Sequence, residues 1–338
     1  MIKPKVAIFS DLHLGIYANS EKWHNTALEW AKWIVKDLKS KNIKDILFLG
    51  DFFHNRSELS VQTLHVASEI IRIFKDFNMI MIVGNHDCFY KNRCDIHSLG
   101  LLKNHDNITL IDSPEIISAF GKQLLFIPWN CDLPDGKYDY IFGHFEIQSF
   151  KMNNYKVCDH GMDIMDFLAS RTSNVFSGHF HHRNTKKYNE GMINYVGNTF
   201  PMDFSDIDNI KGYHILDIES GKLEFFENPV SPRFKKILAS QIKSYKSEDI
   251  ENNIVKLVID LEMSDKNVEK FQLYISKFKP WQFTTEYATI SMVINDIGQI
   301  DSINLVEVFD EYIKELKFNT DKNFRVETII KNLYEKNK

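Results

Sequence analysis

The sequence predicts an α/β protein with an at least partly parallel sheet, and two observations support this. Short apolar runs alternate with amphipathic helical segments through the first half of the chain. Most of these runs end beside a glycine, and Asp, Asn or His follows. In such sheets, ligands collect at the carboxyl ends of the strands. We therefore expect the polar residues after these strands to meet in one site.

The elements can be assigned in order along the chain. Strands are expected at residues 6–9, 46–49, 80–83, 108–111, 124–127, 140–142 and 174–176, with helices over 23–38 and 60–77. The first strand, helix and second strand form a βαβ unit, whose two strands run parallel. A last pair of strands is expected near 193–196 and 213–218.

The composition changes after residue 227. Residues 228–247 hold five Lys or Arg, no acidic residue and two prolines, which is typical of a linker. A strand at 254–261, a helix at 266–278 and a strand at 287–294 then form a small β-α-β module. Two apolar helical stripes follow, at 305–316 and 324–333. The expected domains are therefore 1–227, 228–298 and 299–338.

The composition is that of an ordinary globular protein, with 43% hydrophobic and 26% charged residues among 338. No apolar run approaches the roughly 20 residues that span a bilayer, and no secretory signal is apparent, so a cytoplasmic protein is expected. The four cysteines lack zinc-type spacing and are expected as reduced thiols. A net charge of -5 argues against a uniformly basic surface, although it leaves room for local basic patches.

Five motifs carry the chemistry. They are Asp11-x-His13, Gly50-Asp51, Gly84-Asn85-His86-Asp87, Gly143-His144 and Gly178-His179-x-His181. Carboxylates, imidazoles and one amide oxygen form a mixed N/O ligand set that suits manganese, iron or zinc better than calcium or magnesium. Two such cations can polarise a phosphate for in-line attack. Asp51 is expected to bridge them, because the two oxygens of a carboxylate can bind two cations at once.

Each motif alone is weak evidence, since a lone Asp-x-His or Gly-Asp is most often a turn. Their occurrence in one order, each after a strand, makes a metal site the better interpretation. Asp87 is expected to cap its loop rather than to orient His86. The remaining histidines and the tryptophans of the first helix are not expected to take part in the chemistry. His160 and His182 are expected on the surface, and the structural or solvated histidines are His24, His65, His97, His105 and His214. Trp23, Trp30 and Trp33 are expected to pack in the core or against a helix.

The motifs resemble those of calcineurin-like metallophosphoesterases. Gly-Asp-x-Phe-His, Gly-Asn-His-Asp and Ser-Gly-His-Phe-His are similar to those of the SbcD-type double-strand-break-repair nucleases, over residues 1 to 220. Ile127-Pro128-Trp129-x-Cys131 and the short chain are similar to the recombination endonuclease subunits of large tailed phages. The resemblance implies a four-layer α/β/β/α sandwich, a small α+β capping domain and a C-terminal helical pair. It also implies DNA exonuclease and endonuclease activity in recombination, repair and replication.

The resemblance also implies roles for individual residues. The first metal would be held by Asp11, His13, Asp51 and His181, and the second by Asp51, Asn85, His144 and His179. Both would be manganese, with magnesium or zinc as alternatives. His86 would stabilise the phosphorane or protonate the leaving oxygen, and His54 would position the scissile strand.

The resemblance implies partners as well. DNA would contact the capping domain through Arg233, Lys235, Lys236 and Lys243, against the plainer interpretation of a solvated linker. The C-terminal helices would bind an SMC-like coiled-coil ATPase of the SbcC type, and the phosphoesterase domain would form a homodimer. The chain lacks a G-x-x-x-x-G-K-[ST] loop, so ATP hydrolysis would come from that partner.

Two other functions stay open from the sequence. One is a hydrolase of the same fold that acts on a small phosphodiester or a phosphoprotein, and the residues after the phosphoesterase domain argue against it. The other is a mainly architectural DNA-end-binding subunit, which the complete ligand set argues against. The polarity of digestion and the preferred DNA end are not determined by the sequence.

Overall fold

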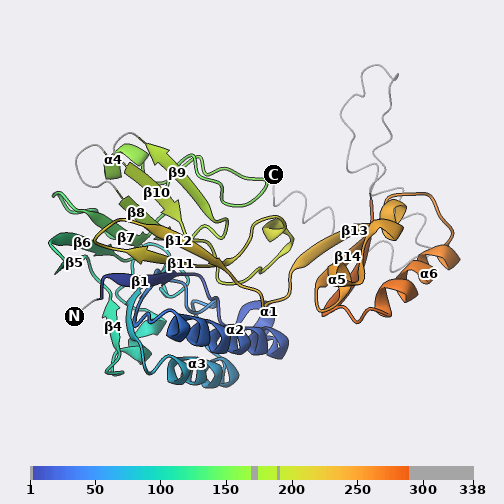
Figure 1. The fold of residues 1–338 in the computed structure, drawn as a ribbon, viewed down its shortest axis with the longest axis horizontal. Coiled ribbons are helices and arrows are strands. Elements are labelled where there is room, and N and C mark those ends of the chain that lie inside the picture. The colour runs from blue at the N-terminus through green and yellow to red at the C-terminus, as the bar shows by residue number, and fades with distance from the viewer. Residues whose placement is uncertain (1–2, 169–173, 189–190, 289–338) are drawn as a thin grey trace, which may run out of the picture. The chain divides into compact units, whose positions relative to one another are not determined.

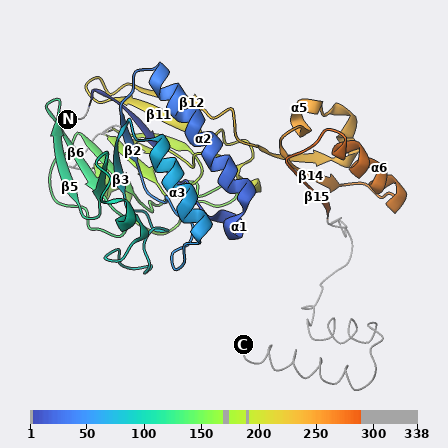
Figure 2. The ribbon, with the colours of Figure 1, turned by 90° about the horizontal axis from the view of Figure 1, so that it is seen from below.

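The structure is a computed structural model that describes residues 3–168, 174–188 and 191–288. Residues Met1–Ala288 form one compact unit, and Thr289–Lys338 are assigned to a second. The expected C-terminal helices lie in the second unit, outside the described residues. The described part contains two six-stranded sheets and one three-stranded sheet (Figures 1 and 2).

The first sheet has the order β12-β11-β1-β2-β3-β4. Its strands are β1 (Lys5–Phe9), β2 (Asp45–Phe48), β3 (Asn78–Ile82), β4 (Ile108–Ile111), β11 (Gly212–Asp217) and β12 (Leu223–Glu227). β1 to β4 are parallel, as expected from the βαβ pattern. The helices α2 (Glu21–Ser40) and α3 (Val61–Ile73) supply the crossovers and cover one face of this sheet (Figure 2).

The second sheet has the order β5-β6-β7-β8-β10-β9. Its strands are β5 (Glu115–Ala119), β6 (Lys122–Ile127), β7 (Tyr140–His144), β8 (Asn174–Gly178), β9 (Asn184–Tyr188) and β10 (Gly191–Tyr195). The last two expected strands are present as β10 and β11, but they do not pair with each other, because β10 joins this sheet beside β8 whereas β11 pairs with β1 of the first. Both strands are apolar, so periodicity could not show which sheet each one enters.

Side-chain alternation along β1 shows how the layers form. Ala7 and Phe9 pack with the apolar faces of α2 and α3, while Val6 and Ile8 pack between the two sheets. A third cluster, which includes Ile141 of β7, covers the outer face of the second sheet, where α4 (Ile164–Leu168) lies. These layers confirm the α/β/β/α sandwich. The inner strands of the two six-stranded sheets, such as β2 and β7, are buried on both faces, which explains their continuous apolar runs.

The third sheet consists of β13 (Phe234–Leu238), β14 (Ile254–Ile259) and β15 (Gln282–Tyr287), all parallel. The expected linker at 228–247 is therefore wrong in its second half. Phe234 packs into the core beside α2, whereas Ile237 packs into the core of the third sheet, with the half-buried Lys235 and the exposed Lys236 between them. The last strand was expected at 287–294, but it ends at Tyr287, and residues from 289 lie outside the described part. The helix α6 (Asp265–Ser276) connects β14 to β15, as the expected module requires.

The remaining short elements are α1 (Ile16–Asn19), α5 (Ser247–Ile250) and the 3-10 turns η1 (Ser98–Leu102), η2 (Phe204–Asp206) and η3 (Ala239–Ser244). Trp23 and Trp30 are buried in the core, as expected, and Trp33 packs against it. Trp23 lies against Phe234 of β13, with ring centroids 6.2 Å apart. Within residues 3–168, 174–188 and 191–288, no helix has both the length and the apolar character needed to cross a membrane.

Candidate metal centre

The carboxyl ends of five parallel strands converge on one site. β1 and β2 of the first sheet lead to Asp11 and Asp51, and β3 leads to Asn85. From the second sheet, His144 ends β7 and His179 follows β8. All seven predicted ligands lie in this region, in two groups that are described below.

The glycines beside these ligands have a steric role. Gly50 has φ +95°, and a Cβ there would lie 2.5 Å from Nδ1 of His144. A Cβ at Gly84 would collide with the backbone nitrogen and Oδ1 of Asp51. Only a residue without a side chain lets these strand ends approach so closely. The repeated pattern of strand, glycine and ligand therefore reflects the crowding of the site.

Several predicted ligands occupy the left-handed backbone region, which residues with side chains rarely adopt. The φ angles are 56° for Asp11, 47° for His13, 59° for Asp51 and 85° for His179. Such conformations cost free energy and cluster at functional sites, where the surrounding structure holds them in place. This backbone turns the side chains into the site instead of continuing the strands.

The first group consists of Asp11, His13 and His181, whose ligand atoms lie within 4.8 Å of one another. Nε2 of His13 is 2.9 Å from Nε2 of His181 and 3.8 Å from Oδ1 of Asp11. Burial lowers the pKa of His181 to about 4 and holds the pKa of His13 well below its usual value. Both imidazoles are therefore neutral and keep a lone pair for a cation.

The second group consists of Asp51, His144 and His179, whose ligand atoms also lie within 4.8 Å of one another. Nε2 of His144 is 3.3 Å from Oδ2 of Asp51. The side-chain amide of Asn85 joins this group, 2.8 Å from Nε2 of His144 and 2.9 Å from Nδ1 of His179. Nδ1 of His144 lies 2.7 Å from the carbonyl oxygen of Leu49, so it is the protonated nitrogen that leaves Nε2 facing the site.

Asp51 connects the two groups through one oxygen atom. Oδ2 of Asp51 lies 3.6 Å from Nε2 of His13 in the first group and 3.3 Å from Nε2 of His144 in the second. Its other oxygen, Oδ1, accepts a hydrogen bond of 2.7 Å from the backbone N–H of His86. This is the geometry expected of a carboxylate that bridges two cations.

The electrostatics of the site fit divalent cations. Burial raises the pKa of Asp11 to about 7, because the ionised carboxylate is removed from water and the nearby His144 offsets this only in part. Burial would lower the pKa of His144, but the Asp51 carboxylate raises it to about 9. Burial also opposes ionisation of Asp51, yet His144 holds the pKa of that carboxyl well below its usual value. Divalent cations would supply this compensating charge and displace the extra proton.

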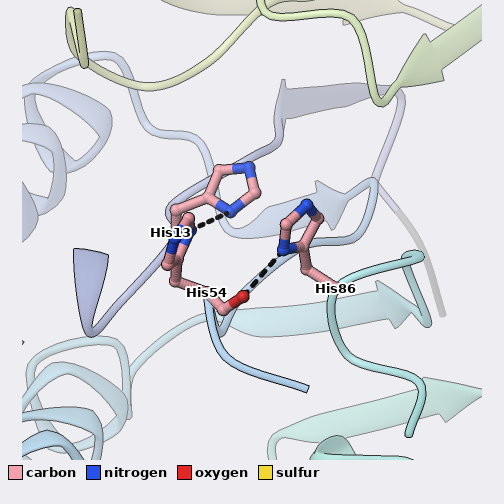
Figure 3. A group of neighbouring side chains, drawn as sticks. All are labelled: His13, His54 and His86. Atoms are coloured by element: carbon pink, nitrogen blue, oxygen red, sulfur yellow. Dashed lines mark hydrogen bonds between the residues drawn. The ribbon is translucent and has the colours of Figure 1, made fainter. Parts of the chain in front are cut away.

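His86 and His54 lie beside His13 of the first group (Figure 3). The rings of His86 and His13 are 4.7 Å apart between centroids, and His86 stacks on His54 at 5.3 Å. Nδ1 of His86 donates a 2.7 Å hydrogen bond to the carbonyl oxygen of His54, which fixes the ring and leaves Nε2 for proton transfer. One ring nitrogen from each of His13, His54 and His86 also lies within 4.8 Å of the other two. This spacing would also let His86 bind a cation, and the metal content of His86→Ala separates the two roles.

Asp87 has a structural role, as expected. Its Oδ2 accepts hydrogen bonds from the backbone N–H groups of Asp51 (2.9 Å) and Gly84 (3.0 Å), and Oδ1 accepts one from Phe53 (3.1 Å). The side chain therefore joins the loops after β2 and β3. This supports the capping interpretation over an interaction that orients His86.

Comparison with known proteins places the chain in a family. The family of calcineurin-like phosphoesterases matches residues 4–183, just over half of the chain. The chain belongs to the calcineurin-like phosphoesterases. This phosphoesterase is 26% identical to exonuclease subunit 1 of Enterobacteria phage T4 over 332 residues, covering 94% of each chain. The resemblance expected from the five motifs is thus confirmed.

Two further relatives are similar over much of the phosphoesterase. The D subunit of the nuclease SbcCD from Staphylococcus epidermidis is 24% identical over 268 residues, covering 65% of this chain and 67% of the relative. The DNA double-strand break repair protein Mre11 of Methanocaldococcus jannaschii is 22% identical over 329 residues, covering 91% and 87%. Their matches reach beyond the phosphoesterase motifs, so the similarity is not confined to the ligand pattern.

Sequence reasoning missed Arg56 of this phosphoesterase. One terminal atom of the Asn85 amide faces the second group, and the other lies 2.8 Å from Nη2 of Arg56. Nη1 of Arg56 is buried and has no hydrogen-bond partner among the described residues. A guanidinium at this position is suited to a phosphate oxygen. The signal was weak, because an arginine shortly after a predicted strand-end motif has no periodicity to mark it.

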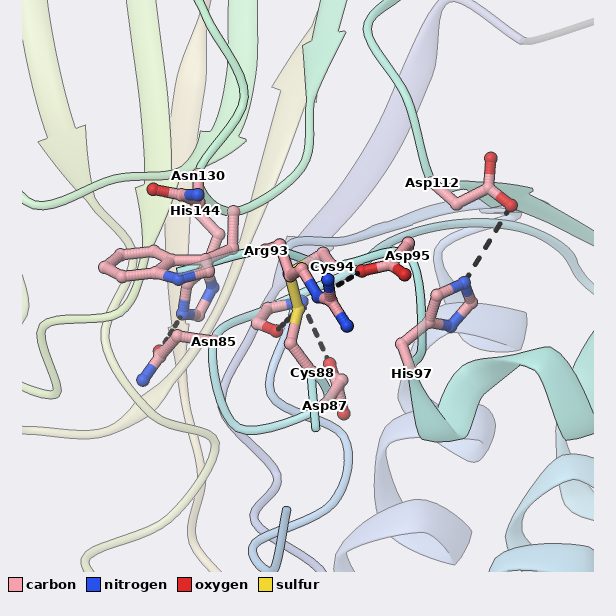
Figure 4. Close-up of a disulfide and its surroundings, with 12 residues drawn as sticks. Asn85, Asp87, Cys88, Arg93, Cys94, Asp95, His97, Asp112, Asn130 and His144 are labelled. Carbon is pink, nitrogen blue, oxygen red and sulfur yellow. Dashed lines mark hydrogen bonds and ion pairs between the residues drawn. A yellow bond between two sulfur atoms is a disulfide. The ribbon is translucent and has the colours of Figure 1, made fainter. Parts of the chain in front are cut away.

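The expectation of four reduced thiols is wrong for two of them. Cys88 and Cys94 form a disulfide in the loop that follows Asn85 and Asp87 (Figure 4). The loop folds back on itself, since the N–H of Phe89 donates to the carbonyl of Ile96 at 2.9 Å. This return brings the two Cα atoms within 5.0 Å, which the spacing of the cysteines did not reveal. Cys131 and Cys158 are free, as expected.

The predicted DNA-contacting residues lie just before, on and after β13, apart from the motifs in sequence. Arg233 pairs with Glu227, and Nζ of Lys235 is 3.8 Å from Asp249. Lys236 and Lys243 are exposed, and the described residues include no ion-pair partner for either. These two lysines are therefore the most available for a phosphate. Of the other histidines, His24 and His214 are buried and structural, whereas His160 is exposed.

Proposed function

We propose that this phosphoesterase is a metal-dependent DNA nuclease that hydrolyses phosphodiester bonds with two cations, manganese being the expected metal. The shared oxygen of Asp51, within 3.6 Å of ligand atoms in both groups, is the observation that carries this proposal. The relatives named as nucleases support DNA as the substrate. When bound, the two cations would polarise the phosphate and lower the pKa of the attacking water.

The protein's own residues divide the remaining work. Asp11, His13 and His181 hold one side of the site, while Asn85, His144 and His179 hold the other. His86 would donate a proton from Nε2 to the leaving oxygen, because its Nδ1 is held by the His54 carbonyl. His54 would position the scissile strand beside it.

The decisive experiment compares substrates. Purified protein is incubated with linear duplex DNA, single-stranded DNA and a generic phosphodiester, each with manganese or magnesium and each with and without an SMC-like ATPase and ATP. We expect cleavage of DNA that requires the metal. Turnover of the generic substrate alone would indicate a small-molecule phosphoesterase, and DNA-end binding without any turnover would indicate an architectural subunit.

Arg56 is expected to contribute to turnover by binding the phosphate. Replacing it in Arg56→Met should lower kcat by roughly 100-fold, the loss typical of removing one charge-stabilising donor. Arg56→Lys should recover part of the activity because it keeps the charge. Arg72→Met, an exposed arginine paired with Glu69 on α3, is the matched control. A fall in metal affinity with an unchanged kcat would instead show that Arg56 acts on the second group of ligands and not on the phosphate.

DNA contact by the basic segment predicts a change in salt dependence. Neutralising Lys235, Lys236 and Lys243 together should reduce the slope of log affinity against log salt by up to about 3, roughly one per lost phosphate contact. The measurement is a fluorescence-anisotropy titration of duplex DNA at several salt concentrations. The control neutralises three lysines outside this segment, Lys39, Lys103 and Lys222, whose loss should leave the slope unchanged. If the slope of log affinity against log salt is the same in both triple variants, the basic segment does not contact DNA and is only a solvated surface.

The C-terminal segment is proposed to bind the ATPase partner. Its two apolar stripes, at 305–316 and 324–333, would be covered by that contact. A truncation after Asn295 should therefore lose co-purification with the ATPase while keeping metal-dependent cleavage of DNA. Retention of the ATPase by the truncated protein would refute this role.

A further inference from the structure

A third group of metal-ligating side chains lies outside the two groups already described. It consists of Glu146, Cys158 and His160, whose ligand atoms all lie within 4.8 Å of one another. Nε2 of His160 is 3.2 Å from Oε1 of Glu146, and Sγ of Cys158 lies 3.1 Å from the backbone oxygen of His160. None of these residues belongs to the five motifs. The group combines a thiol, an imidazole and a carboxylate, whereas the other two groups contain no sulfur.

The backbone that carries this group is closely paired. The N–H of Cys158 donates to the carbonyl of Phe150 at 2.8 Å, and the N–H of Met162 donates to the carbonyl of Glu146, also at 2.8 Å. Between them, Gly161 has φ +87°, and a Cβ there would collide with the carbonyl of Glu146. The segments 146–150 and 158–162 are thus locked together. The three ligand side chains are held near one another before any ion binds, which lowers the cost of assembling a site.

We infer that Glu146, Cys158 and His160 form a binding site for a third divalent cation of the zinc class. A tetrahedral zinc ion with bonds of about 2.0–2.3 Å separates its ligand atoms by about 3.5 Å, so a small contraction of this group closes around one ion. The thiolate selects against manganese and magnesium, which prefer oxygen. His160 is exposed, so solvent reaches this group and a water would serve as the fourth ligand.

The third site lies next to the second predicted metal. Oε1 of Glu146 is also 3.7 Å from Nε2 of His179, whose Nδ1 faces Asn85 in the second group. Glu146 therefore acts as the carboxylate that orients a metal-binding imidazole from behind. A cation on Glu146 would draw on the same oxygen. Binding of a cation at the third site would therefore affect the second metal site through Glu146.

Cobalt titration tests this site directly. A cobalt ion bound to a thiolate has a charge-transfer absorption that a site built from oxygen and nitrogen cannot give. The metal-stripped full-length protein is first saturated with manganese and then titrated with Co²⁺, without thiol reductant so that Cys88 and Cys94 stay joined. We expect the absorption to appear and its maximum intensity to correspond to one thiolate-bound cobalt per chain, since any cobalt that replaces manganese at the other sites does not contribute to it.

Variants assign the absorption to a residue. Cys158→Ser should lose it completely, whereas Cys131→Ser, the other free cysteine, should keep it. Because Cys158 is buried and its replacement can perturb folding, His160→Ala on the surface is the second variant, and it should move the titration midpoint to higher cobalt. Absence of the absorption in the unaltered protein, its persistence in Cys158→Ser, or an unchanged midpoint in His160→Ala would overturn the inference. The readout does not depend on nuclease activity, so it is independent of the proposed function.

Discussion

Asp51→Asn is expected to weaken the binding of both metals together. Oδ2 of Asp51 lies between the two groups, so replacing the carboxylate by an amide removes negative charge from both sites at once. Mutating a residue that only hydrogen-bonds to a metal ligand typically lowers metal affinity by roughly 10–100-fold. Because Asp51 is itself a predicted ligand, the affinity for each metal should fall by more than this. Isothermal titration with Mn²⁺ and metal analysis of the purified protein measure this effect, and DNA cleavage should be lost with it.

A matched acidic residue provides the control for this variant. Asp112 pairs with Lys103 at 3.6 Å and does not belong to either group, so Asp112→Asn should bind two metals normally. If Asp51→Asn keeps one tight metal and loses the other, Asp51 belongs to a single site. The bridge, and with it the two-metal proposal, would then be wrong.

His86→Ala is expected to abolish most of the turnover while both metals stay bound. Nδ1 of His86 is fixed by the His54 carbonyl, so the ring presents Nε2 as the proton donor, and loss of a general acid typically costs roughly 10²–10⁴-fold in rate. Cleavage rate under single-turnover conditions and metal content should be measured on the same preparation. His105→Ala, an exposed histidine outside the motifs, is the control and should behave as the unaltered protein.

Metal content decides between two roles for His86. The close approach of His13, His54 and His86 would also permit a ligand role. If the metal stoichiometry of His86→Ala falls by one, His86 is a ligand and its assignment as a proton donor that does not bind metal is wrong. An intact stoichiometry with lost turnover supports the acid role.

The sandwich and the position of its site could be predicted because both leave local signals. Strands such as β1 are buried on both faces and appear as uninterrupted apolar runs. Glycines such as Gly50 are required by crowding at the strand ends, so the ligand positions are marked in the sequence too. The first strand of the third sheet was not predicted, because two lysines separate Phe234 from Ile237 in β13 and the two apolar side chains enter different cores, so no two-residue alternation marks the strand.

The sequence by itself determined the fold class and the identity of the groups that gather at the strand ends, since periodicity and the glycine-ligand pattern are local properties. Only the tertiary structure decided that one oxygen of Asp51 faces both groups, that Arg56 contacts Asn85, that Cys88 and Cys94 are joined, and that Cys158 and His160 lie beside Glu146. These are distances between atoms on separate loops. They depend on how the two sheets pack and how each loop returns, which no spacing along the chain records.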